Sequence, residues 1–260
     1  MIREHLDGIV LYRFERLRGA EGLVHAVLTR IGGVSQAPYA TLNLGHTVGD
    51  DLAAVGENHR RALGALGLEP GGVVSPYQVH GARVGMVGHA HRGTVQPATD
   101  ALVTGVPAVP LLMRFADCAP VLFFDCVRRV VGMAHAGWRG VVAGAVGATV
   151  RAMAERLGCE PADLWAGVGP TIGPCCYAVG PEVVAAVQAA CPPGADVVRR
   201  VDGSTHLDLP AAVQAQLRAA GVERVEDAGL CTACRVDEFF SHRAERGRTG
   251  RFGVVLGLLE

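Results

Sequence analysis

Lysine is absent from this 260-residue chain, so all 24 of its Lys and Arg residues are arginines. The absence excludes a Walker-A phosphate loop, a Schiff-base lysine for pyridoxal phosphate and a lysine general base. An anion bound by this protein must therefore meet arginine guanidiniums, backbone amides or a metal ion.

Charge is scarce as well, with 19% charged residues, a net charge of −1 and no basic block. This pattern predicts neither a nucleic-acid partner nor a membrane-surface partner. The longest candidate for a membrane span, the uncharged stretch from Leu164 to Pro181, is broken by Gly and Pro, so no transmembrane helix is expected. The N-terminus, MIREHLDGIVLYRFERL, interrupts its apolar residues with charges and does not resemble a secretory signal. We expect a cytoplasmic protein whose eight cysteines are thiols.

Half of the residues are hydrophobic, and no linker, repeat or low-complexity segment divides the chain. We therefore expect one mixed α/β domain over residues 1–260, without the regular alternation of a doubly wound sheet. Apolar and β-branched runs predict strands over 25–29, 72–81, 109–118, 120–125, 130–137 and 251–259. Helical spacing predicts helices over 51–67, 141–157, 181–190 and 211–220, the first capped by Asp50 or Asp51.

Two segments resemble known motifs but lack the required spacing. GVGPTIG (167–173) is spaced GxGxxxG, with Pro170 where a dinucleotide-binding helix would begin. CTAC (231–234) is a CxxC, but the adjacent pair Cys175–Cys176 does not have the spacing of a second zinc-ribbon pair. Neither segment predicts a site by itself.

Three residues fall at the ends of predicted strands beside small or turn-forming residues: His80 in PYQVHG, Cys118 in RFADCAP and His135 in GMAHAGWRG. Two imidazoles and a thiolate form a set suited to catalytic zinc, with the fourth position left for water or substrate. Two other interpretations are open from the residues alone. The histidines could activate Cys118 as a nucleophile, or all three residues could be ordinary core residues.

The chain resembles the YfiH-type, or laccase-domain, family over nearly its whole length. The resemblance rests on the order of these blocks: TRIGGVSQAPYATLNLGHTVGDD (29–51), YQVHG (77–81), TDALVTG (99–105), ADCAPVLFFD (116–125), AHAGWRG (134–140), GVGPTIGPCCYAVG (167–180) and CTACRVDEFFSHRAERGRTGRFG (231–253). The family was long labelled polyphenol oxidase and is associated with zinc-dependent purine nucleoside phosphorylase activity. Adenosine deaminase and methylthioadenosine phosphorylase activities accompany it. The resemblance implies a layered α/β/β/α sandwich.

The resemblance also implies roles for single residues. It assigns zinc to His80, Cys118 and His135, and it places Asn43 of LNLG in a site-lining loop. The helix after GDD usually carries Asn-Arg, and that arginine is implicated in catalysis. Here the pair is Asn58-His59, followed by Arg60 and Arg61. We expect His59 or a neighbouring arginine such as Arg60 to replace it.

Phosphorolysis needs groups that bind a phosphate dianion. Arg30, Arg139 and Arg243 are candidates because each lies in a family-like block, although a packing or solvated arginine is the alternative for each. His242 is a further candidate for the site. Asp117, next to Cys118, is either a general acid/base for deamination or the cap of a turn. Trp138 is expected to pack over the AHAGWRG turn.

The leading prediction is an enzyme acting on purine nucleosides and phosphate, with Zn²⁺ as cofactor, as a monomer or a homodimer. A metal-free Cys–His hydrolase and a non-enzymatic nucleoside- or metal-binding module are the alternatives. A copper-dependent polyphenol oxidase fits less well, because His89-Ala90-His91 is the single His-x-His pair of the chain. Copper could still bind a thiolate–imidazole site adventitiously.

Overall fold

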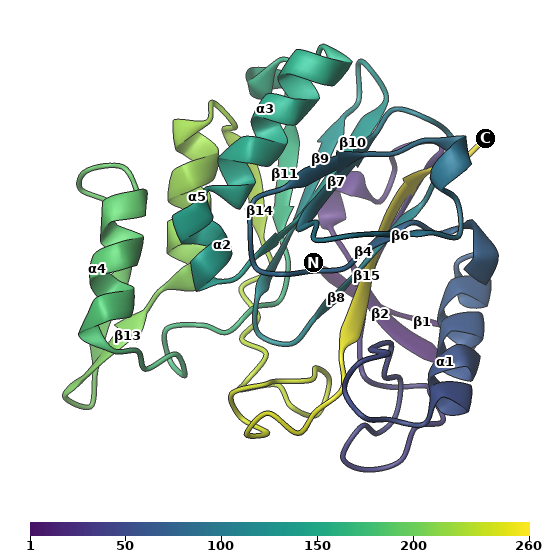
Figure 1. The fold of residues 1–260 in the computed structure, drawn as a ribbon, viewed down its shortest axis with the longest axis horizontal. Coiled ribbons are helices and arrows are strands. Elements are labelled where there is room, and N and C mark those ends of the chain that lie inside the picture. Colours follow the sequence, from purple (N-terminus) through teal and green to yellow (C-terminus); the bar gives the residue numbers. More distant parts are fainter.

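Two β-sheets lie face to face in the centre of the molecule, and helices cover the outer face of each (Figure 1). The structure, a computed structural model, describes residues 1–260. The first sheet is antiparallel and has the strand order β1 (Ile2–Leu6), β2 (Ile9–Arg13), β3 (Leu23–Leu28), β15 (Phe252–Leu258) and β8 (Leu111–Phe115). It thus joins the two ends of the chain.

The second sheet is mixed, with parallel pairs at both edges and antiparallel pairs in the middle. Its order is β14 (Arg224–Asp227), β11 (Trp165–Val168), β9 (Ala119–Asp125), β10 (Val130–Ala136), β7 (Ala101–Thr104) and β5 (Val84–Met86). Strands β9 and β10 are buried along their whole length because both faces of this sheet are covered. Two short pairs complete the strands: β4 (Ser75–Pro76) with β6 (Val95–Gln96), and β12 (Val198–Val201) with β13 (Ser204–Leu207).

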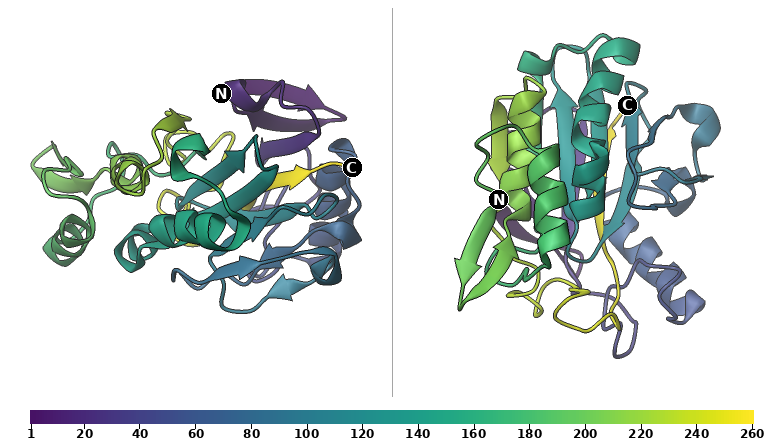
Figure 2. Two further views of the ribbon diagram at one scale, coloured as in Figure 1. Left: turned by 90° about the horizontal axis from the view of Figure 1, so that it is seen from above. Right: turned by 60° about the vertical axis from the view of Figure 1, so that its left-hand side comes forward.

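Helices α2 (Trp138–Ala143), α3 (Ala145–Leu157) and α5 (Leu209–Ala219) lie on the outer side of the second sheet, and α4 (Pro181–Ala190) packs outside α2 (Figure 1). Helix α1 (Leu52–Ala65) lies on the opposite side of the molecule, beyond the first sheet (Figure 2). The expected α/β/β/α sandwich is therefore confirmed. No helix has both the length and the apolar character needed to cross a bilayer.

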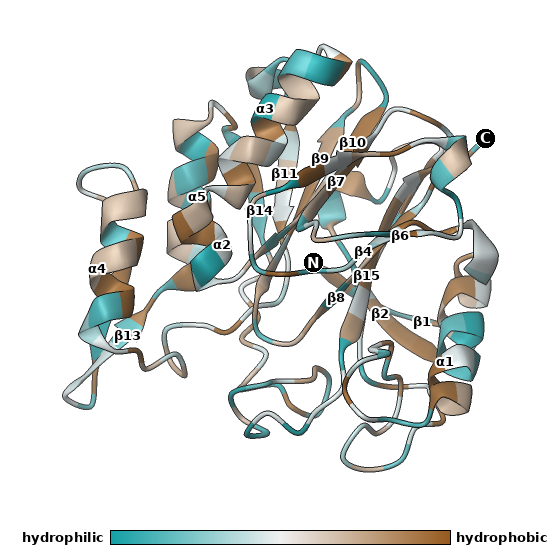
Figure 3. Ribbon diagram, viewed as in Figure 1, coloured by the Kyte–Doolittle hydropathy of each residue, from teal (hydrophilic) through white to brown (hydrophobic).

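Three clusters of buried side chains match these layers. Aromatic residues such as Phe115, Phe124 and Phe252 fill the space between the sheets. Smaller residues such as Val150 and Val213 fill the space under the helices of the second sheet, and Leu63 of α1 packs on the first sheet. Figure 3 shows mainly hydrophobic central strands, whereas α1 and α3 carry hydrophobic and hydrophilic residues. Burial of these apolar layers is the main stabilising contribution.

Several sequence-based boundaries differ from the structure. The predicted strand over 72–81 is reduced to Ser75–Pro76, and the chain from Tyr77 to Gly81 forms a loop. The predicted helix over 141–157 begins earlier, at Trp138, and is divided at Gly144, whose φ of 77° is left-handed. Asp51 caps α1 as predicted, because its side chain accepts a hydrogen bond from the Ala53 N–H.

Candidate metal and anion site

The three predicted ligand residues meet at one end of the second sheet. His135 is the penultimate residue of β10, and Cys118 lies in the turn between β8 and β9. His80 lies in the loop after β4 with a left-handed φ of 63°, so it does not end a strand as the sequence pattern predicted. Their potential ligand atoms all lie within 4.8 Å of one another, and the two imidazole centroids are 4.8 Å apart.

The carboxylate of Asp100, the residue before β7, holds two of these residues in place. Its oxygens accept hydrogen bonds from the backbone N–H groups of His80 and Gly81, each at 2.8 Å. The same carboxylate lies 2.8 Å from His135 Nδ1. Because Nδ1 is occupied in this way, Nε2 of His135 is the nitrogen left for a metal or for Cys118.

Gly137 allows the AHAGWRG turn to approach the site. A Cβ atom at this position would lie 2.6 Å from Cys118 Sγ and 3.5 Å from His80 Cδ2. Any other residue would therefore displace the thiol. Gly137 is also the residue that precedes α2, so the turn both ends the strand and shapes the site.

The electrostatics of the group favour a thiolate. Burial opposes the charged form of Cys118, but the charge of His135 and hydrogen bonds from both histidines outweigh it and lower the pKa of Cys118 to about 6. Burial also opposes the charged form of His135, but Cys118 and Asp100 raise its pKa to about 9. A thiolate is the form of cysteine that binds metals and attacks electrophiles. Two imidazoles and one thiolate, with the histidine oriented by a carboxylate, fit a catalytic zinc centre.

A cavity of about 830 Å³ opens beside this group, and its lining includes four arginines: Arg114, Arg139, Arg243 and Arg251. None of them pairs with a carboxylate side chain. Arg114, Arg243 and Arg251 donate to backbone carbonyls, and Arg139 stacks over the Trp138 ring at 4.3 Å. Burial lowers the pKa of Arg114 to about 10, which leaves it charged at neutral pH. Cations without protein counter-ions favour binding of an anion.

Comparisons with known proteins agree with the family resemblance of the sequence. Residues 24–259 match the family described as multi-copper polyphenol oxidoreductase laccase. The purine nucleoside phosphorylase YlmD of Geobacillus stearothermophilus is 39% identical over 250 residues, covering 92% of this chain and 91% of that protein. A purine nucleoside phosphorylase of Streptomyces griseus is 44% identical over 239 residues, covering 91% of this chain and 95% of that protein. The crystal structure of YlmD from Geobacillus stearothermophilus matches with a TM-score of 0.93 and 36% identity, covering 99% and 98% of the two chains. The chain belongs to this laccase-domain family.

The arginine that the family usually carries after Asn58 is not replaced by Arg60. The Arg60 side chain is 67% exposed and forms two hydrogen bonds of 2.7 Å with Glu57, one turn earlier on α1. Arg61 also pairs with Glu57. Both guanidiniums therefore lie on the solvent side of α1, and the structure does not bring them to the cavity.

His59 lies behind the cavity wall rather than in it. It is buried, and its Nε2 lies 3.0 Å from the Leu44 carbonyl oxygen, which also accepts a hydrogen bond from Arg114 Nε at 2.7 Å. Burial and the charge of Arg114 lower the pKa of His59 to about 4. His59 is therefore a neutral donor at neutral pH, and it shares a carbonyl with a cavity arginine.

Asn43 and Arg30 do not line the cavity, because their polar atoms are engaged elsewhere. Asn43 is buried, and its side chain bonds to Gly45, Asp50 and the backbone N–H of Arg251. It thereby positions two lining residues, Gly45 and Arg251. Arg30 donates to Glu245 at 3.0 Å and to two backbone carbonyls, and it lies over the Phe240 ring. The phosphate role predicted for Arg30 does not fit this placement.

Asp117 lines the cavity, but both of its carboxylate oxygens are occupied. They accept hydrogen bonds from the Thr232 hydroxyl at 2.7 Å and from the Arg243 backbone N–H at 2.6 Å. The left-handed φ of 87° at Asp117 also marks a constrained turn. These contacts favour the turn-capping interpretation over a general acid/base. His242 and Arg139 line the cavity as predicted residues of the site, and Trp138 packs partly buried at its edge.

Sequence reasoning missed four residues of the site: Asp100, Arg114, Tyr177 and Arg251. Asp100, Tyr177 and Arg251 fall inside the family-like blocks, which are the one signal in the sequence that points to them. Arg114 lies in a predicted strand, with nothing in the sequence to show that its side chain would face a cavity. Tyr177 lies beneath Arg243, with 5.0 Å between the guanidinium carbon and the ring centroid.

Proposed function

We propose that this protein is a zinc-dependent purine nucleoside phosphorylase. It would convert inosine, adenosine or guanosine and phosphate into the free base and ribose-1-phosphate. One observation carries the proposal: the His80–Cys118–His135 group and four arginines without carboxylate partners face the same cavity. The relatives named purine nucleoside phosphorylase support it.

The arginines suit the phosphate and the departing purine. In phosphorolysis a phosphate oxygen bonds to C1′ of the ribose, the C1′–N9 bond breaks, and its electron pair leaves with the purine. Guanidiniums at the cavity wall bind the phosphate dianion and stabilise negative charge that develops on the base. In this proposal Arg139 and Arg243 bind phosphate, and His242 lies at the cavity rim beside Arg243.

His80, Cys118 and His135 would hold the zinc ion, with Asp100 orienting His135. When bound, Zn²⁺ supplies Lewis acidity toward an oxygen of the substrate or of water. Zinc is preferred to copper because the only group of potential metal ligands that contains histidine has two imidazoles, too few for a multicopper cluster.

Exposed apolar side chains at the cavity mouth suit the purine ring. Tyr77 is 58% exposed and Val95 is 59% exposed, and both line the cavity. A base stacked on such groups removes apolar surface from water. The proposed adenosine deaminase and methylthioadenosine phosphorylase activities follow from the same cavity, since their substrates also carry a purine ring.

A reduced thiolate ligand also suits the cytoplasm, where we propose that the protein acts as a monomer or a homodimer.

A second candidate is a metal-free hydrolase, and the Asp100–His135–Cys118 chain favours it. The carboxylate, imidazole and thiol follow the order of a nucleophilic triad. Zinc analysis and chelation separate the two candidates. Activity that resists a chelator but is lost on thiol alkylation would support the hydrolase.

The decisive measurement is product analysis on zinc-quantified protein incubated with inosine, with and without phosphate. We expect hypoxanthine and ribose-1-phosphate in equal amounts, and only with phosphate present. Cys118→Ser should lower turnover at least about 100-fold, because it removes a ligand. The exposed Cys126→Ser is the matched control and should keep full turnover. Full turnover by Cys118→Ser, or free ribose formed without phosphate, would contradict the proposal.

A further inference from the structure

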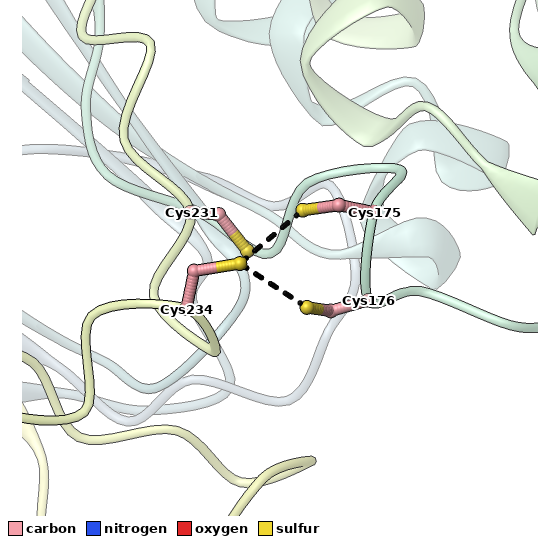
Figure 4. A group of neighbouring side chains, drawn as sticks. All are labelled: Cys175, Cys176, Cys231 and Cys234. Atoms are coloured by element: carbon pink, nitrogen blue, oxygen red, sulfur yellow. Dashed lines mark hydrogen bonds between the residues drawn. The ribbon is translucent and has the colours of Figure 1, made fainter.

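Four cysteines outside the cavity meet in one place. Cys175 and Cys176 lie in the loop between β11 and α4, and Cys231 and Cys234 lie in the loop after β14 (Figure 4). The four sulfur atoms lie within 4.8 Å of one another. Their spacing along the chain does not predict that the two pairs meet, because adjacent cysteines lack zinc-ribbon spacing. Folding nevertheless brings the two loops, and with them the four cysteines, together.

The distances between the sulfurs fit four ligands around one tetrahedral metal ion rather than a disulfide bond. Cys234 Sγ lies 3.5 Å from Cys175 Sγ and 3.4 Å from Cys176 Sγ. Tetrahedral zinc with Zn–S bonds of 2.3 Å places its sulfurs about 3.8 Å apart. Because Cys234 is almost equally close to two partners, no single disulfide accounts for the group, whereas one metal ion uses all four sulfurs.

The surrounding backbone is built to bring the two loops together. Thr171 and Cys231 form a parallel bridge, and the Gly173 N–H donates to Cys231 Sγ at 3.2 Å. A Cβ atom on Gly173 would lie 3.4 Å from Cys175 Sγ and 3.3 Å from Cys231 Cβ, so the glycine leaves room for the sulfurs. A backbone N–H donor to sulfur stabilises a thiolate, which is the form that ligates zinc.

We propose that Cys175, Cys176, Cys231 and Cys234 form a second, structural zinc site with four thiolate ligands. Four protein ligands leave no open position, so this ion would stabilise structure rather than act on substrate. The proposal does not depend on the proposed enzymatic activity.

The position of this cluster indicates what the ion would stabilise. Thr171 and Thr232 flank the cluster in the two loops, and both bond to Asp117, the neighbour of Cys118. Tyr177, which follows Cys176 directly, lines the cavity under Arg243. A zinc ion joining the loops would thus fix one wall of the cavity.

Zinc content of wild-type and variant proteins, purified under reducing conditions without chelator, tests the proposal. We expect Cys231→Ser to lose about one zinc ion per chain relative to wild type while keeping the zinc that Cys118→Ser loses. The exposed Cys126→Ser is the control and should keep the wild-type content. Equal zinc in wild type and Cys231→Ser, or iron in place of zinc, would overturn the proposal.

Alkylation of the wild-type protein gives a test that needs no variant to fold. Cys126, Cys175 and Cys234 are all exposed. With zinc bound, we expect Cys126 to react with iodoacetamide while Cys175 and Cys234 are protected, and a chelator should remove the protection. Protection lost on reduction rather than chelation, with a mass lower by about 2 Da, would indicate a disulfide and overturn the proposal. Cys175 and Cys234 that react as fast as Cys126 would overturn it as well.

Discussion

At the residue scale, Asp100 controls the candidate metal group although it does not ligate the metal in our proposal. Its Oδ1 lies 2.8 Å from both the His80 N–H nitrogen and His135 Nδ1. Asparagine would keep the shape but place an NH₂ donor against groups that are themselves donors. We expect Asp100→Asn to weaken zinc binding about 10–100-fold and to lower kcat/KM with it. Competition with a chromogenic chelator measures the affinity.

A matched control is available on the surface. The Asp196 side chain is 79% exposed and pairs with Arg199, so Asp196→Asn should leave zinc affinity unchanged. Wild-type zinc affinity in Asp100→Asn would show that the carboxylate does not orient the ligands.

His25 and His59 make the stability of the protein depend on pH. Burial lowers the pKa of each to about 4 from the ordinary value of 6.5. Above pH 6.5 both histidines are neutral in the folded and in the unfolded protein. Between pH 6.5 and pH 4 they bind a proton only in the unfolded protein. Stability is therefore lost as pH falls, by about 2 kcal/mol per histidine at pH 5. Urea unfolding at pH 8 and pH 5 should show this loss, and His59→Gln should reduce it. An unchanged loss in His59→Gln, with the exposed His89→Gln as control, would contradict the assignment.

His80, Cys118 and His135 stand out in the sequence because each follows an apolar run beside small or turn-forming residues, but that pattern left a metal site, a nucleophile and core residues all open. The metal role came from the family resemblance. It could not reveal Asp100, since an aspartate before a strand is common and its partners come from a distant loop. It also could not separate Arg30 from Arg139. Both lie in family-like blocks, and only the fold turns Arg30 toward Glu245.

At the element scale, hydrophobic periodicity predicted the buried strands and the long helices. It failed where the backbone angles of a few residues determine where an element begins or ends. The run over 72–81 looks like a strand, but the side chain of Asp100 replaces strand pairing by accepting the N–H groups of His80 and Gly81. The helix predicted over 141–157 is divided because Gly144 takes a left-handed conformation as the C-cap of α2.

Two glycines of this helical region should respond to alanine in opposite directions. Gly144 has a φ of 77°, so Gly144→Ala should destabilise the protein by about 1–2 kcal/mol although no atom lies within 4 Å of the new Cβ. Gly147 lies inside α3, where a Cβ meets only the flexible Arg151 side chain at 3.4 Å. Gly147→Ala should therefore stabilise by about 0.5–1 kcal/mol. Urea unfolding measures both, and effects of the same sign would contradict the division of the helix at Gly144.

At the scale of the whole molecule, the site exists because the two sheets end beside each other. Arg114 lies in β8 of the first sheet and Arg251 directly precedes β15 of the same sheet, whereas His135 lies in β10 of the second sheet. Cys118 lies in the turn that connects the two sheets. The family resemblance predicted this sandwich, but the hydrophobic periodicity of the sequence does not show which arginines face the cavity. The convergence gives a protein of net charge −1 a cavity lined by four arginines and by one carboxylate, that of Asp117.

This local charge predicts how phosphate binding depends on one arginine and on salt. Arg139 lies at the cavity with its guanidinium over Trp138 and no carboxylate partner. Because a charge-assisted contact to phosphate would be lost, Arg139→Gln should raise the KM for phosphate about 10-fold and change the KM for inosine little. Added salt should raise the phosphate KM less in the variant than in the wild type, since one screened attraction is already missing. Arg156→Gln, an exposed change in the last turn of α3, is the control and should leave both constants unchanged. A rise confined to the inosine KM would contradict this prediction and would show that Arg139 binds the nucleoside rather than the phosphate.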